Sequence, residues 1–308
     1  MHWLFETGFG LLKLVAYTVW GVVGPLCLRP RRNATPDLSA DVCVITGAGR
    51  GLGRELALKF AACGATVVLW DINEEHLKSV ADEIGALGGD AHYYVCDCSK
   101  SEQVQRTAAS VREEVGNVAI LVNNAGIVTG KSFAESSEKE IQKVMEVNAL
   151  AHFWTTKAFL PWMIENNYGY IISIGSVLAF CGLNGVTDYA ASKAAVQSFT
   201  ESLRYELIAS KKSGITVSCI CPYQMDTGMF EGVKNRFPRI LAPLNPVQVA
   251  QRTVKAMMNR EHLVVIPNYF RLFMFLKCVL PVRAFDELLN LIGANDAMKS
   301  FVGHQKKH

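Results

Sequence analysis

The sequence predicts an α/β fold in which helices cover both faces of a doubly wound parallel sheet. Runs rich in Val, Ile and Leu alternate with helical patterns from residue 41 to residue 220. The first run stops at a cluster of glycines, and a helical pattern follows at once. Because most of these runs are apolar throughout, they are typical of parallel strands that are buried on both faces.

The glycine cluster follows the first expected strand, at residues 42–45. Gly47, Gly51 and Gly53 have the spacing Gly-x-x-x-Gly-x-Gly, with Arg50 and Leu52 between them. Such glycines permit a tight turn and let the backbone approach a pyrophosphate, which then sits on the N–H groups of the helix N-terminus. This strand, loop and helix therefore predict a Rossmann-type fold, with these five residues in the cofactor-binding loop.

The remaining elements follow in regular order, without a break in composition that would indicate a second domain. Strands are expected at residues 42–45, 66–70, 92–96, 118–122, 170–174 and 215–220, and helices at 51–63, 74–87, 101–115, 138–149, 151–166 and 188–212. A single catalytic domain is therefore predicted over residues 41–308.

Composition narrows the class of protein. The net charge is +3, and no basic run is interleaved with aromatic residues, which argues against a nucleic-acid partner. The nine cysteines fall mostly in apolar runs, where they behave as small hydrophobic residues, and reduced thiols are expected. The seven histidines are dispersed, so no metal site is expected.

The first 28 residues are predicted to form a hydrophobic membrane anchor, followed by a basic and polar linker at residues 29–40. Residues 11–28 are apolar except for Lys13. As a helix they span about 27 Å, against about 30 Å for a bilayer core, and the stretch becomes long enough when counted from Trp3. Arg29, Arg31 and Arg32 favour a cytosolic catalytic domain. A signal peptide, a hairpin and a buried core helix are the alternatives.

Two residues bear on the choice of cofactor. Asp71 ends the second expected strand, where a carboxylate binds both hydroxyls of the adenosine ribose and repels a 2′-phosphate. This favours NAD. Arg50 in the glycine loop can instead accept a 2′-phosphate, which keeps NADP open. Asp97 follows the third expected strand, where it either contacts the adenine or only ends the turn.

Polar residues near the ends of later strands complete the candidate site. Asn124, within Asn-Asn-Ala-Gly, ends the fourth expected strand. Tyr189 and Lys193 are four residues apart and so share one face of a helix. A nearby ammonium favours the phenolate and lowers the tyrosine pKa, which suits Tyr189 to exchange a proton with an alcohol or carbonyl. Ser176, after the fifth strand, is placed to hydrogen-bond the same substrate oxygen.

These motifs, in this order and spacing, resemble the short-chain dehydrogenase/reductase family over residues 41–267. The resemblance implies that Tyr189 is the catalytic acid/base, that Ser176 orients the substrate oxygen and that Lys193 binds the nicotinamide ribose. It also implies that Asn148 holds a water in a proton relay and that Thr227 contacts the nicotinamide carboxamide. The chain departs from the family at Tyr223, where Gly is usual.

Three further stretches are similar to the membrane-anchored retinol dehydrogenases: residues 69–73, 151–161 and 227–230. Their relatives include lipid-droplet 17-beta-hydroxysteroid dehydrogenases. The resemblance implies a homodimer in the endoplasmic reticulum membrane or on lipid droplets. The expected reaction is oxidation of all-trans-retinol to all-trans-retinal with NAD, Tyr189 being the general base. A 17-beta-hydroxysteroid or another lipid alcohol is the alternative substrate, and a membrane scaffold of low activity is the alternative class.

The residues expected around the substrate are largely apolar. Val177, Leu178, Ala179, Phe180 and Cys181 follow Ser176, and Tyr223, Met225, Met229 and Phe230 follow the sixth strand. Such a lining suits a long apolar alcohol. Residues 263–280 are also apolar and either cover the pocket, lie against a membrane or pack on the sheet.

Overall fold

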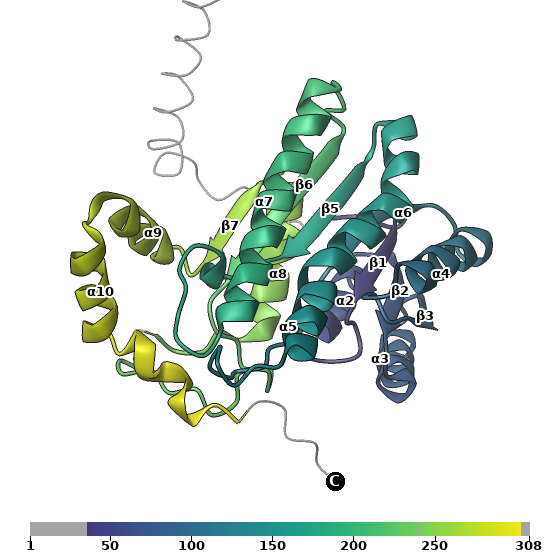
Figure 1. Cartoon of the computed structure of the whole chain (residues 1–308). Helices are drawn as coiled ribbons and strands as arrows, with labels where there is room; N and C mark the ends of the chain where they lie inside the picture. The colour runs from purple at the N-terminus through teal and green to yellow at the C-terminus, as the bar shows by residue number, and fades with distance from the viewer. Residues whose placement is uncertain (1–35, 240, 303–308) are drawn as a thin grey trace, which may run out of the picture. The chain divides into compact units, whose positions relative to one another are not determined.

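The computed structural model describes residues 36–239 and 241–302, and a seven-stranded parallel sheet runs through this region (Figure 1). The strand order is β3-β2-β1-β4-β5-β6-β7. The strands are β1 (Val42–Thr46), β2 (Thr66–Asp71), β3 (Ala91–Val95), β4 (Val118–Asn123), β5 (Gly169–Ile174), β6 (Ile215–Pro222) and β7 (Leu263–Ile266). The order reverses between β1 and β4, and ligands of doubly wound sheets bind at such a switch point.

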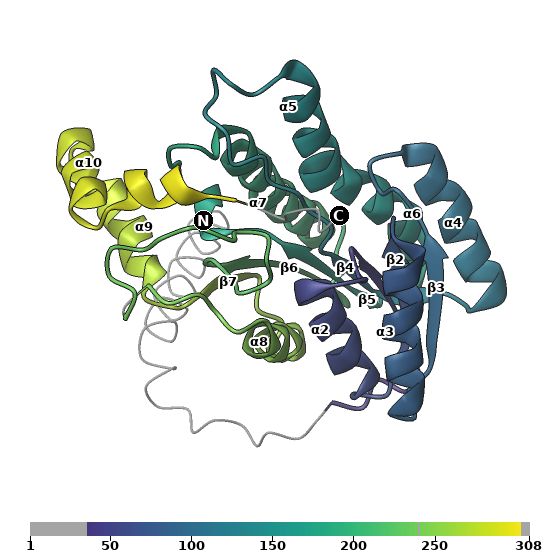
Figure 2. The same cartoon turned by 90° about the horizontal axis from the view of Figure 1, so that it is seen from below.

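Helices cover both faces of the sheet, as Figure 2 shows. One layer contains α2 (Gly51–Ala61), α3 (Glu74–Ala86) and α8 (Pro246–Met258), and the other contains α4 (Ser101–Glu114), α6 (Ala151–Asn166) and α7 (Thr187–Ala209). Leu56 and Phe60 of α2 are fully buried against the first face, while Trp70 of β2 packs at 5.7 Å from the ring of Phe159 on the second. The predicted single-domain Rossmann-type sheet is thereby confirmed.

The sequence predicted six strands, and all six are present. The seventh, β7, is a four-residue strand at the start of the apolar segment 263–280 and pairs with β6. Four residues are too few for periodicity to separate a strand from a helix, so its pairing only becomes apparent in the folded chain.

The helix predicted for residues 138–149 changes its type before it ends. Helical structure begins at Glu138, but the α-helix α5 (Glu138–Met145) gives way to a π-helical turn, η1 (Glu146–Leu150), before α6 starts. The helix predicted for 138–149 is therefore shorter than expected. The wider turn contains Asn148, and π-turns inside helices are frequent at functional sites.

The C-terminal part adds helices beyond the sheet edge at β7 (Figure 1). They are α9 (Phe270–Val279), α10 (Val282–Leu291) and the 3₁₀ helix η3 (Ala294–Ser300). Among residues 36–239 and 241–302, no helix is long and apolar enough to cross a membrane. The predicted anchor, and all but the last residues of the predicted linker, lie outside the described residues.

Candidate active site

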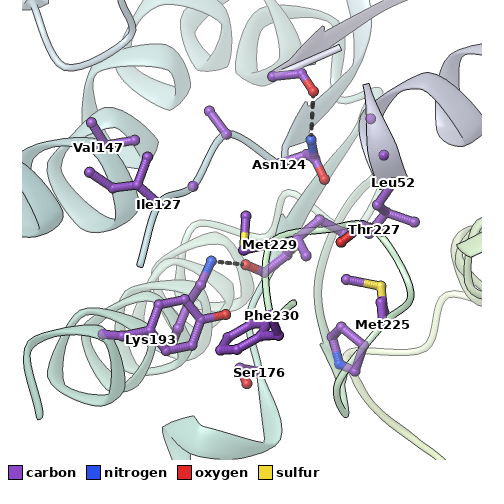
Figure 3. Close-up of a pocket in the computed structure, with 18 of the residues that line it drawn as sticks. Leu52, Asn124, Ile127, Val147, Ser176, Lys193, Met225, Thr227, Met229 and Phe230 are labelled. Carbon is purple, nitrogen blue, oxygen red and sulfur yellow. Dashed lines mark hydrogen bonds between the residues drawn. The ribbon is translucent and has the colours of Figure 1, made fainter. Parts of the chain in front are cut away.

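A cavity of about 420 Å³ lies at the carboxyl ends of the central strands (Figure 3). It brings together residues that the sequence spreads over 180 positions. Twelve of the thirteen predicted site residues line it: Gly47, Arg50, Gly51, Leu52, Gly53, Asp71, Asp97, Asn124, Ser176, Tyr189, Lys193 and Thr227. The thirteenth, Asn148, is fully buried and hydrogen-bonds the backbone of Ile127, a lining residue.

The glycine loop has the close packing that a phosphate cradle needs. Gly47 and Gly51 have positive φ angles of 64° and 55°. A Cβ on Gly53 would lie 2.0 Å from the carbonyl oxygen of Gly47, so no other residue fits there. No side chain caps the N-terminus of α2, which leaves its first N–H groups available to an anion. These features fit the pyrophosphate of a dinucleotide.

Asn124 holds this loop against the end of β4. Its Nδ2 donates to the carbonyl oxygens of Thr46, at 2.9 Å, and Gly47, at 3.1 Å. The Thr46 hydroxyl in turn accepts from the backbone N–H groups of Asn124 and Ala125. Asn124 therefore lines the cavity and also fixes the shape of the glycine loop, a structural contact that the sequence did not predict.

Asp71 lies directly beside the glycine loop. Its carboxylate accepts from the backbone N–H groups of Gly49 and Asn73, each at 3.1 Å. The exposed Arg50 is the residue before α2 and lines the same end of the cavity. The two opposite charges that bear on the choice of cofactor are thus both present at this end.

Asp97 has local partners as well as a place in the cavity wall. It accepts from the backbone N–H and the hydroxyl of Ser99 and pairs with Lys143 at 3.0 Å. Burial by itself would raise the pKa of Asp97, but the hydrogen bonds from Ser99 and Lys143 together lower it. The carboxylate is therefore charged at neutral pH and held in place.

Tyr189, Lys193 and Ser176 converge on one side of the cavity. Lys193 Nζ lies 5.7 Å from the centre of the Tyr189 ring and donates to the carbonyl oxygen of Ile174 at 2.7 Å. Ser176 Oγ accepts from the backbone N–H of Leu178. All three side chains are buried, and in Figure 3 Ser176, Lys193 and Phe230 surround the same hollow.

Burial governs the titration of the two ionisable groups. It raises the pKa of the Tyr189 hydroxyl above its usual value, and a hydrogen bond with Ser176 offsets this only in part. It lowers the pKa of Lys193 to about 8. The sequence predicted that Lys193 would lower the tyrosine pKa. The direction is the opposite because desolvation of the phenolate is the largest cause of the shift, and only the hydrogen bond with Ser176 acts against it.

Asn148 makes three side-chain hydrogen bonds in the π-turn. Its Oδ1 accepts from the backbone N–H of Ile127 at 2.8 Å, while its Nδ2 donates to the Ile127 carbonyl oxygen and to the Ser192 hydroxyl. Its side chain thus joins the loop after β4 to α7, which contains Tyr189 and Lys193.

Several wall residues come from parts of the chain that the sequence did not connect with the site. Ala297 and Met298 of η3 line the cavity more than 100 residues beyond Tyr189. No motif marks them, because their position depends on how the C-terminal segment folds back. The predicted apolar residues Val177, Leu178, Tyr223, Met225, Met229 and Phe230 do line it. Phe180 and Cys181 line a neighbouring cavity instead.

The fold and the site together define a nucleotide-binding oxidoreductase of the doubly wound class. The family model of the short chain dehydrogenases matches residues 41–236. The chain belongs to this family and is an enzyme of the alcohol dehydrogenase type. The family assignment made from the motifs is therefore confirmed.

Known proteins extend this likeness over most of the chain. Epidermal retinol dehydrogenase 2 of Homo sapiens is 42% identical over 282 residues, which cover 91% of this chain and 89% of the relative. A short-chain dehydrogenase/reductase from Burkholderia phymatum, solved in complex with NAD, matches with a TM-score of 0.71 and 28% identity, covering 82% of this chain and 95% of the other. A variant of actinorhodin polyketide ketoreductase, solved with NADPH, matches with a TM-score of 0.69 and 26% identity, covering 76% and 98%.

Proposed function

We propose that this enzyme oxidises all-trans-retinol to all-trans-retinal with NAD. The observation that carries the proposal is the convergence of the Tyr189 and Ser176 hydroxyls with apolar walls, next to a glycine loop that fits a dinucleotide. Phe230 packs edge-on against the Tyr189 ring at 5.5 Å, and Met225 and Met229 extend the apolar lining. The name of the human relative, a retinol dehydrogenase, supports the same substrate.

The chemistry requires a hydride and a proton to leave the same alcohol. A bound oxidised nicotinamide supplies a positive charge and the carbon that accepts the hydride. Ser176 orients the alcohol oxygen, and the Tyr189 phenolate takes the hydroxyl proton. Lys193 holds the nicotinamide ribose and adds positive charge beside the tyrosine, while Asn148 keeps the π-turn in place and holds a water for the proton relay. The raised pKa of Tyr189 means that bound charge is needed before it acts as a base.

NAD is the proposed cofactor because of Asp71. Its carboxylate faces the backbone of Gly49, where the adenosine ribose of a dinucleotide seated on this loop would lie. A 2′-phosphate there would meet a fixed negative charge. Arg50 opposes this preference but is exposed and therefore strongly screened.

The proposed setting follows from the sequence. Residues 1–28 anchor the chain in the endoplasmic reticulum membrane, residues 29–40 link the anchor to the domain, and the catalytic domain over 41–308 faces the cytosol. Lipid droplets are a second location. The exposed Phe153 of α6 and the exposed Tyr205 and Ile208 of α7 support a homodimer that forms through these long helices.

The decisive experiment measures retinal formed from all-trans-retinol by membranes that carry the full chain, with NAD and NADP in parallel. Tyr189→Phe is the matched variant because it removes only the hydroxyl. Retinal made with NAD and lost in the variant supports the proposal. Turnover of steroid or other lipid alcohols but not of retinol would replace the substrate, and undiminished activity of the variant would refute the tyrosine mechanism.

A further inference from the structure

A second cavity adjoins the proposed alcohol site and lies beneath the C-terminal helices. It has a volume of about 90 Å³ and is lined by Phe270, Phe273 and Met274 of α9 together with Phe285 and Leu289 of α10. Only the inner face of α9 contributes to it. The second cavity is almost wholly apolar and so suits a hydrocarbon group.

The two cavities share part of their walls. Val177, Leu178 and Tyr223 line both. The Tyr223 ring stacks on Phe270 of α9, with ring centres 4.8 Å apart, and its hydroxyl donates to Asn235 Oδ1 at 2.8 Å. Tyr223 therefore places an aromatic ring in the wall that the two cavities share.

The opposite face of α9 is apolar and exposed. Leu272, Phe275 and Val279 retain 58%, 60% and 56% of their accessible surface, and Val282 just beyond retains 77%. Their spacing of three and four residues aligns them along one side of the helix. Figure 1 shows α9 and α10 beyond the edge strand β7, away from the helical layers of the sheet. A helix that is apolar both toward the protein and toward solvent needs a further apolar partner.

The charged residues of α9 itself are both basic. They are Arg271 and Lys277, and Arg283 follows on α10, where the exposed Asp286 and Glu287 come next along the helix. Lys277 also donates to the carbonyl oxygen of Phe180, which ties α9 to the loop that follows Ser176. Basic residues beside exposed aliphatic and aromatic side chains are typical of helices that lie in a membrane interface. At ten residues α9 is about 15 Å long, so it would lie on a bilayer without crossing it.

We propose that α9 docks on a phospholipid surface through Leu272, Phe275 and Val279, and that the second cavity is the passage by which an apolar alcohol reaches Tyr189 from the lipid. The docking stands on the exposed apolar face and its basic flanks, whereas the passage rests on the proposed function. A substrate that partitions into lipid would then pass from acyl chains to apolar cavity walls without crossing water.

The test of docking uses Cys278, an exposed thiol on α9, as a reporter that needs no turnover. The full chain is placed in vesicles of phosphatidylcholine with a minor fraction of phosphatidylserine and treated with a water-soluble maleimide. The reference thiol comes from Glu113→Cys on α4, which is also exposed. We expect Cys278 to react about tenfold more slowly than this reference, because a thiol at the acyl boundary is shielded from a water-soluble reagent. Cys43 and Cys219 are buried and should stay unlabelled in the folded protein.

Two glutamates on the outer face of α9 should reverse the protection. The combined substitutions Leu272→Glu and Phe275→Glu lie on exposed positions outside both cavities, and Leu87→Glu on an exposed leucine near α3 is the matched control. The pair should restore Cys278 labelling and lower the rate with vesicle-dissolved retinol relative to a short water-soluble alcohol, while the control should do neither.

Three results would overturn the docking proposal. One is equal labelling of Cys278 and the reference thiol. Another is protection that persists in the glutamate pair. The third is protection that disappears when protein is diluted into excess lipid, which would assign the face to a second copy of the chain. Because labelling requires no catalytic turnover, absence of retinol oxidation leaves this test intact. Normal retinol oxidation with an unprotected Cys278 would refute docking alone.

Discussion

Replacing Asp71 by Asn should weaken the preference for NAD, because the substitution removes charge and preserves shape. The amide retains one oxygen to accept from Gly49 or Asn73, so the loop keeps most of its support. Two unit charges about 5 Å apart interact by roughly 3 kcal/mol at an effective dielectric constant of about 20. Asp71 is partly exposed, and discounting this repulsion for screening leaves about 2 kcal/mol, or about a 30-fold change in selectivity.

The assay compares kcat/KM for NAD and NADP with one alcohol, in the parent enzyme and in Asp71→Asn. The ratio should move toward NADP by about 30-fold, most of it through faster use of NADP. Asp97→Asn is the control, since that carboxylate is already paired with Lys143 and should shift the ratio far less. Arg50→Gln should move the ratio in the opposite direction. A shift of less than about threefold in Asp71→Asn would refute the assignment of selectivity to this carboxylate.

The remaining predictions concern the loop, the buried lysine and the second cavity. Gly53→Ala should abolish dinucleotide binding, measured by fluorescence titration, and lower the free energy of unfolding by about 3 kcal/mol, because its Cβ would meet the Gly47 carbonyl oxygen at 2.0 Å. Gly85→Ala, in a helix with open space around it, should be neutral or stabilising, and a similar loss there would contradict the steric argument. In the unliganded enzyme the pKa of Lys193 is lowered from 10.5 to about 8, so the unfolded chain binds more protons over this range. The free energy of unfolding should therefore gain a contribution of roughly 3 kcal/mol as the pH rises from 8 to 10.5, and Lys193→Met should lose that slope in denaturant titrations. An unchanged slope would show that another group titrates. Met274→Trp fills part of the 90 Å³ second cavity and should lower kcat/KM for a long apolar alcohol about tenfold relative to a short one. An unchanged ratio would exclude the cavity as the passage.

Local sequence was sufficient to predict the strands, the loop and the helix that contain the candidate site. Apolar runs identified the predicted strands, and β1, β2, β4, β5 and β6 are buried along most of their length, so they have no polar side to alternate. The edge strand β3 is partly exposed. The glycine spacing identified the cradle, since Gly53 has no room for a Cβ and Gly47 needs a positive φ angle. The four-residue spacing is sufficient to place Tyr189 and Lys193 on one face of a helix.

Other features depend on contacts between distant parts of the chain. The direction of the pKa shift of Tyr189 is such a feature. It is set mainly by the burial of the hydroxyl, and burial depends on side chains from distant parts of the chain. The π-turn at Asn148 is another, since the amide needs the backbone of Ile127 as a partner.

The sequence by itself therefore predicted the class of protein, six of the strands and the thirteen candidate site residues, twelve of which line one cavity. These predictions depend on short local patterns: apolar runs of strand length and motifs of a few residues. The tertiary structure decided which apolar segments wall the site and which remain exposed. Residues 263–280 show why: one apolar run supplies the edge strand β7, the inner wall of the second cavity and the exposed face of α9. All three parts are rich in apolar residues, and packing against neighbours distinguishes them.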